Sequence, residues 1–91
     1  MAFTKEEAVE RARQYLAQRL GVSAADIRED SAENADFPDL ALGAPLKDEM
    51  SGQMITPGWR IHLSAAGRSF EYRANKNQIR LFNYKGSNHR V

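Results

Sequence analysis

The chain has no cysteine, only three prolines, and no long hydrophobic run in its 91 residues. Without cysteine it has no disulfide framework, no thiolate metal ligand and no thiol nucleophile. Neither the start, MAFTKEEAVERARQYL, nor any later stretch approaches the ~20 apolar residues of a membrane span. We therefore expect a cytoplasmic protein that has no membrane partner.

Catalytic patterns are also missing. The two glycine-rich phosphate-binding patterns do not occur, and the two histidines, His62 and His89, stand without a recognisable motif around them. A chain this short buries only about 60–65% of the surface that its unfolded form exposes, so its pockets should be shallow. The sequence therefore predicts neither an enzyme nor a cofactor.

Four carboxylates are close enough in sequence to raise the question of a metal: Asp36, Asp39, Asp48 and Glu49. Hard cations bind clustered oxygen ligands, but this spacing fits no calcium-binding loop. Asp36 and Asp39 flank Pro38, and we expect both to cap turns through bonds from their side chains to the backbone. No metal site is predicted.

Charge is distributed unevenly along the chain. Residues 1–50 carry 6 basic and 11 acidic side chains, whereas residues 51–91 carry 7 basic and 1 acidic, which leaves a net charge of +1. Such asymmetry can mark an interaction tail, but both halves also contain core-forming residues. The simpler interpretation is an acidic helix and loop that lie against a basic sheet.

The first predicted element is a helix over residues 5–20. Thr4 and Glu7 form a capping-box pattern at its start, and Gly21 suits the left-handed position that ends a helix. One narrow apolar stripe follows helical spacing. It consists of Val9, Ala12, Leu16 and Leu20.

The last third of the chain predicts an antiparallel meander over residues 59–84, because apolar and polar residues alternate between turn signals. The residues expected to face the helix are Trp59, Ile61, Leu63, Phe70, Tyr72, Ile79 and Leu81. The side chains expected on the opposite face include Arg60, Arg73, Arg80, Phe82 and Tyr84. The acidic segment 27–33 is predicted as an edge strand, and residues 53–56 as a short additional strand.

The fold class that follows is α+β, with one N-terminal helix packed on an antiparallel sheet of three to five strands. Residues 1–91 form a single domain, and residues 85–91 read as a polar tail. Residues 36–58 contain all three prolines and seven large apolar residues, too apolar for a solvated tail. A long ordered loop is therefore expected there, and loops of this length tend to be functional.

Three segments, DFPDLALGAP, QMITPGWRIHL and GRSFEYRAN, resemble a small bacterial domain family of uncharacterised function. Its signature joins aromatic-Pro-Asp, Leu-Gly-x-Pro and Gln-x-Ile-Thr-Pro-Gly-aromatic-Arg-Ile, and the resemblance covers most of residues 5–75. That pattern often has Cys at the position of Ala44 and His at that of Arg73. The resemblance implies no established activity. In architecture alone the chain is also similar to PepSY-type domains.

Two functions follow as hypotheses. The first is a non-enzymatic protein- or peptide-binding module that uses the loop 36–58, whose candidate contact residues are Leu40, Leu42, Met50 and Met54. The alternative is single-stranded nucleic-acid binding on the basic and aromatic sheet face, through Arg60, Arg73, Arg80, Phe82 and Tyr84. The protein is expected to be a monomer or a weak dimer. The loop would serve only as a cover for the core if its leucines and methionines were buried.

Overall fold

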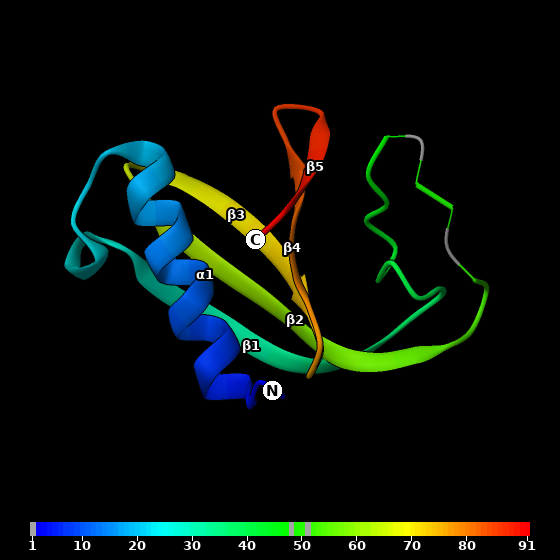
Figure 1. Cartoon of the computed structure of the whole chain (residues 1–91). Helices are drawn as coiled ribbons and strands as arrows, with labels where there is room; N and C mark the ends of the chain where they lie inside the picture. Colours follow the sequence, from blue (N-terminus) through cyan, green and yellow to red (C-terminus); the bar gives the residue numbers. More distant parts are fainter. Residues whose placement is uncertain (1, 48, 51) are drawn as a thin grey trace.

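A computed structural model describes residues 2–47, 49–50 and 52–91. Helix α1 (Lys5–Leu20) is followed by a short 3-10 helix, η1 (Ala24–Asp26), and by five strands. The strands are β1 (Arg28–Phe37), β2 (Thr56–Ala65), β3 (Arg68–Ala74), β4 (Ile79–Tyr84) and β5 (Ser87–Arg90). Figure 1 shows one helix against one twisted sheet, which confirms the α+β prediction.

The ends of α1 are fixed by local chemistry. The Thr4 hydroxyl accepts a hydrogen bond from the Glu7 amide, and the Glu7 carboxylate accepts one from the Thr4 amide, so the predicted capping box forms. Gly21 ends the helix with a φ of 71°, in the left-handed region where glycine is not strained. The predicted helix bounds are therefore confirmed.

The sheet is an antiparallel meander in the order β1-β2-β3-β4-β5. Two of its hairpins close with two-residue turns, Ala66-Gly67 and Lys85-Gly86, and all four of these residues have positive φ. That conformation matches the twist of the flanking strands. The predicted edge strand exists as β1, which is longer than expected, so the connection to β2 covers residues 38–55.

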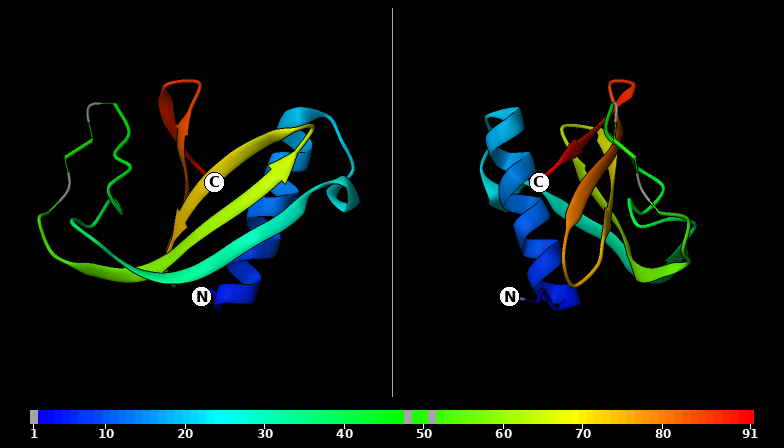
Figure 2. Two further views of the ribbon diagram at one scale, coloured as in Figure 1. Left: turned by 180° about the vertical axis from the view of Figure 1, so that it is seen from behind. Right: turned by 45° about the vertical axis from the view of Figure 1, so that its right-hand side comes forward.

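One face of the sheet packs on α1 and forms the main core. Its buried residues from the sheet include Ile61, Leu63, Phe70, Tyr72, Ile79 and Leu81, as predicted. Trp59 lies on the same face but is only half-buried. The connection 38–55 lies on the other side of the sheet from α1 in the right-hand view of Figure 2.

Three expectations about the end of the chain and the connection need correction. The polar tail 85–91 contains β5, because the Lys85-Gly86 turn returns the chain onto β4. Tyr84, expected on the outer face, belongs to the main core, because an irregularity between Leu81 and Tyr84 inserts one extra residue and reverses the alternation. In the segment 53–56, only Thr56 is part of a strand.

Candidate functional site

The apolar residues of the connection 38–55 divide into two groups. Ala41, Leu42 and Ala44 are at most 1% exposed. Leu40, Met50, Met54 and Ile55 are 44%, 96%, 62% and 72% exposed, respectively. The connection therefore both covers the sheet and presents apolar side chains to solvent.

Leu42 is therefore wrongly placed in the predicted contact surface. It is fully buried, since a turn held by Asp39 directs it against the sheet. The Asp39 carboxylate accepts hydrogen bonds from the amides of Ala41 (3.0 Å) and Gly43 (2.9 Å), as predicted for a turn-capping aspartate. Asp36 has no such role among the described residues, because it lies within β1.

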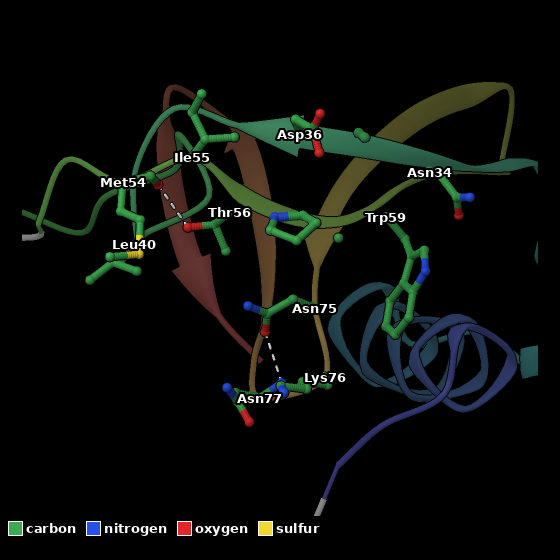
Figure 3. Close-up of a pocket in the computed structure, with 13 residues that line it drawn as sticks. Asn34, Asp36, Leu40, Met54, Ile55, Thr56, Trp59, Asn75, Lys76 and Asn77 are labelled. Atoms are coloured by element: carbon green, nitrogen blue, oxygen red, sulfur yellow. Dashed lines mark hydrogen bonds between the residues drawn. The ribbon is translucent and has the colours of Figure 1, made fainter.

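Three of the exposed apolar residues of the connection line one cleft of about 760 Å³, which we call the edge cleft (Figure 3). Leu40, Met54 and Ile55 form one side of it, and Trp59 lies at the opposite end. The remaining lining residues are Asn34, Ala35, Asp36, Thr56, Pro57, Gly58, Asn75, Lys76 and Asn77. Met50 is exposed but is not part of this lining.

Alternate strand residues that line the edge cleft have their side chains on the same face of the sheet as α1, whereas Leu40, Met54 and Ile55 border the cleft from the connection. Residues directly opposite each other in an antiparallel pair direct their side chains to the same face. Asn34 is opposite Trp59 and Asp36 is opposite Pro57, whereas the preceding pair on this face, Ala32 and Ile61, packs towards the helix. The cleft thus occupies the part of this face that lies beyond the main core.

Hydrogen bonds fix the walls of the edge cleft. The Asn75 side-chain oxygen accepts from the amides of Asn77 (2.8 Å) and Gln78 (3.0 Å), and the Thr56 hydroxyl donates to the Met54 carbonyl (2.9 Å). The Phe3 amide donates to the Lys76 carbonyl at 2.8 Å, which joins the start of the chain to the same turn. These bonds preorganise the cleft before any ligand arrives.

Gly58 lines the edge cleft, and the backbone around it leaves no room for a larger residue. A Cβ at this position would overlap the Ala74 carbonyl oxygen and lie 3.2 Å from the Asn75 Cβ. The close approach of the β2 and β3 backbones therefore requires glycine at this point.

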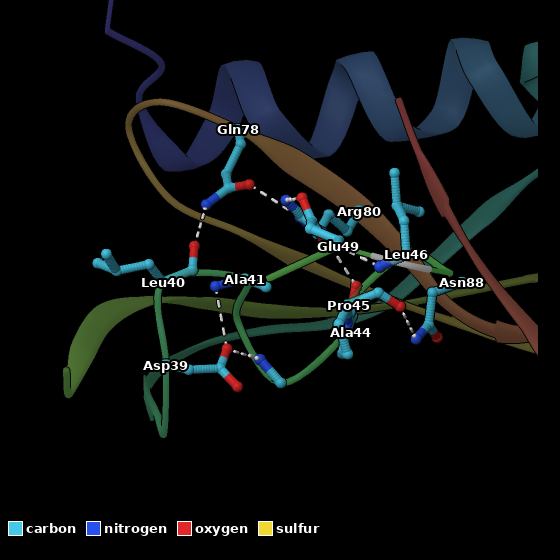
Figure 4. Close-up of polar contacts among 11 residues, drawn as sticks. Asp39, Leu40, Ala41, Ala44, Pro45, Leu46, Glu49, Gln78, Arg80 and Asn88 are labelled. Carbon is cyan, nitrogen blue, oxygen red and sulfur yellow. Dashed lines mark hydrogen bonds and ion pairs between the residues drawn. The ribbon is translucent and has the colours of Figure 1, made fainter. Parts of the chain in front are cut away.

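The opposite face of the sheet holds the arginines that the nucleic-acid hypothesis needs, and Figure 4 shows one of them, Arg80, among its contacts. Arg80 is 3% exposed, and its guanidinium donates to the Ala44 carbonyl (3.1 Å) and to both Glu49 carboxylate oxygens, at 2.8 Å for Nη2 to Oε2. Arg73 donates to the carbonyls of Leu42 (3.2 Å) and Gly43 (3.1 Å). The connection thus binds these two side chains and covers them.

The aromatic rings of Phe82 and Phe37 on that face are also in contact with an arginine. The Arg73 guanidinium carbon lies 3.8 Å from the centre of the Phe82 ring and 5.6 Å from that of Phe37. Arg60 remains partly exposed, with its guanidinium near Glu71 at 3.5 Å. Of the five residues predicted as a nucleic-acid face, Tyr84 is on the helix side, Arg80 is buried and Arg73 is largely covered, so the expected open surface does not form.

The pairing with Arg80 affects the acidity of Glu49. Hydrogen bonds from the Arg80 side chain and then from the Leu46 amide lower the pKa of Glu49 from 4.5 to about 2. Glu49 is therefore a carboxylate throughout the neutral range. Together with Arg80, it fixes Ala44, Leu46 and its own backbone against β4.

Metal ligands do not gather in the described part of the chain. Among residues 2–47, 49–50 and 52–91, no three His, Asp or Glu side chains are grouped so that they could hold an ion. Asp48, one of the four carboxylates considered from the sequence, lies outside the described residues. Within the same ranges, α1 and the other helical residues offer no segment long and apolar enough to cross a bilayer.

Sequence reasoning found the exposed Leu40 and Met54 but missed Asn34, Asp36, Ile55 and the turn at residues 75–77. A signal for Ile55 was available, since it stands beside Met54 at the start of the Ile-Thr-Pro-Gly motif. The contribution of β1 and of the turn depends on which segments pair in the sheet, which short-range patterns do not specify.

The chain belongs to a family described as a domain of unknown function, DUF8738, which matches residues 9–82. This match confirms the expected membership of an uncharacterised domain family. The motif signature and the architectural likeness to PepSY-type domains stay predictions. No curated protein and no solved structure matches the chain.

Proposed function

We propose that this member of the DUF8738 family is a non-enzymatic binding module that takes an apolar side chain of a protein or peptide segment into the edge cleft. The observation that carries this proposal is the exposure of Leu40, Met54 and Ile55, by 44–72%, around one preorganised cleft. Three neighbouring apolar side chains in a rim of amide and carboxylate groups are typical of a site that takes one apolar anchor and orients the flanking chain.

The opposite face supports this proposal over nucleic-acid binding. A single-strand binding surface needs free cations and open rings on which bases stack. Arg73 and Arg80 instead donate to carbonyls of the connection, and the Phe82 ring is occupied by Arg73. These contacts favour a structural role, in which the arginines hold the connection so that its other residues form the cleft.

The test is a selection of peptides from a random phage-displayed library on the whole chain, followed by titration of the selected peptides. The matched variants are the triple change Leu40→Ser, Met54→Ser and Ile55→Ser, and the control Met50→Ser, which is exposed but outside the cleft. Loss of about 1.4 kcal/mol of apolar contact weakens binding tenfold, and we expect at least this loss from the triple variant. The control should bind as the parent does.

Because every substituted side chain is at least 44% exposed, thermal unfolding should show that the variants remain folded. The proposal is overturned if the library yields no peptide, or if the triple variant binds the selected peptides as tightly as the parent does.

A further inference from the structure

The edge cleft includes Asn34, Ala35 and Asp36 of β1, which is one of the two edge strands of the sheet. β1 pairs with β2 on one side only, and its register is interrupted between Glu29 and Ser31. Such irregularities and charged side chains normally protect an edge from further pairing. Beyond the interruption, pairing with β2 runs on to Phe37 in unbroken register.

One contact shows which backbone groups of β1 point outward. The Lys5 ammonium donates to the Ala32 carbonyl at 3.3 Å, so this carbonyl is accessible to a donor that does not belong to β2. In an antiparallel ladder, alternate residues direct their amide and carbonyl groups away from the neighbouring strand. Asn34 and Asp36 share this phase with Ala32, so their backbone groups face the open edge at the side of the cleft.

The charges of this edge select the kind of strand that could pair with it. β1 contains four acidic side chains and one basic one. Glu29 and Asp30 are near Arg13 and Arg28, respectively, whereas Glu33 and Asp36 are exposed and form no ion pair among the described residues. A second copy of β1 would bring like charges together, which is unfavourable, while a basic segment would be attracted.

We propose that the partner of this domain is an extended basic segment that adds to the sheet along residues 33–37 of β1 and places one apolar side chain in the edge cleft. The inference rests on the proposed function and specifies its partner. Main-chain hydrogen bonds would be made to Asn34 and Asp36, as in other cases of strand addition. Alternate side chains of the segment would lie beside Glu33 on one face and beside Asp36 on the other.

The experiment uses five synthetic peptides. The first is acetyl-Lys-Val-Lys-Leu-Lys-Val-Lys-amide, and the second has Glu at every Lys position. In the third, the central Leu is replaced by Ala. The fourth and fifth carry N-methyl groups at alternate backbone nitrogens, one in each of the two possible phases, so that one of them cannot donate to the edge of β1. Each is titrated into the isotopically labelled chain, and amide shifts and hydrogen exchange are followed at residues 33–37.

We expect the first peptide to bind well, with protection of the amides of Asn34 and Asp36, and the Glu peptide, the Ala peptide and the peptide methylated at the nitrogens that face β1 to bind poorly. Glu33→Gln should weaken binding of the first peptide about two- to fivefold at low salt, because the Lys side chains lie on the face of Glu33 when Leu enters the cleft, and the difference should shrink at high salt. Asp36→Asn, on the face of the apolar side chains, should weaken it less. Asp26→Asn is the matched control, because Asp26 lies in η1, outside the edge. At most one of the two N-methylated peptides should bind, because the other lacks the amides that would donate to β1.

Strand addition is overturned if the Glu peptide or both N-methylated peptides bind as well as the first, or if the free chain already pairs through β1 with a second copy in sedimentation analysis. In those cases, if peptide binding still requires the central Leu, the edge cleft remains supported as a binding site. Failure of all five peptides overturns this inference alone, and the proposed function then depends on the library selection.

Discussion

The two parts of the connection between β1 and β2 differ in what holds them. Residues 41–46, which we call the anchored part, are fixed to the sheet by Arg73, Arg80 and the Asp39 turn. Residues 52–55, the exposed part, present Met54 and Ile55 to solvent. The difference shows how one irregular segment can contribute to stability with one part and to binding with the other, because each apolar side chain is either enclosed or left available.

The largest loss of stability is expected at Leu42, in the anchored part. Leu42→Ala removes a fully buried side chain and should destabilise the fold by about 2–5 kcal/mol. Leu40→Ala, two residues away and 44% exposed, should cost less than half as much. Urea unfolding of both variants measures the difference. Equal losses would mean that Leu40 also belongs to the core.

The next largest loss of stability is expected from Arg80→Met. It leaves the Ala44 carbonyl without its Arg80 donor and the Glu49 carboxylate with the Leu46 amide alone, at a cost of about 1–3 kcal/mol. Arg60→Met is the control, because the Arg60 side chain is 43% exposed and its pair with Glu71 is open to solvent. Hydrogen exchange should quicken at residues 41–46 in the Arg80 variant only. Unchanged exchange there would show that other contacts hold the anchored part.

A smaller effect should appear as a dependence on pH. The folded state holds the pKa of Glu49 at about 2 against an ordinary 4.5, so the stability gained from this carboxylate is fully present above about pH 5 and is lost as the pH falls towards 2. Glu49→Gln lacks this contribution. Thermal unfolding from pH 6 to pH 2 should therefore show a steeper loss for the parent than for the variant. Parallel curves would contradict the Arg80–Glu49 pairing.

The smallest effect is expected in the exposed part. Ile55→Thr changes a side chain that is 72% exposed, so the free energy of unfolding should shift by no more than about 0.5 kcal/mol. The same variant should bind the selected peptides more weakly. A stability loss comparable to that of Leu42→Ala would show that residues 52–55 cover the core as well.

Local chemistry made several elements predictable. The capping box at Thr4, the glycine after Leu20 and the alternation from Trp59 to Tyr72 each depend on neighbouring residues, and the structure has them as expected. β5 could also have been predicted from local sequence. The Lys85-Gly86 pair is a two-residue hairpin turn, and weighing that signal would have predicted a strand instead of a tail.

The surface could not be read in the same way. Alternation correctly placed Arg73 and Arg80 on the face away from the helix, but it could not reveal that this face is covered. These two arginines lie directly opposite each other on β3 and β4, an arrangement of like charges that is favourable only because Glu71 and Glu49 neutralise them. Glu49 is 31 residues away from Arg80 in sequence, and no local pattern joins them.

The sequence by itself determined the class of fold, the bounds of α1 and the inward-facing residues of β2 and β3, because hydrophobic period and capping act over a few residues. Only the tertiary structure decided which side chains of the connection are buried. Leu40 and Leu42 are chemically identical and two positions apart, yet one lines the edge cleft and the other lies in the interior. That choice depends on hydrogen bonds to the connection from β3, from β4 and from Gln78 in the turn between them, contacts that exist only once distant segments have come together.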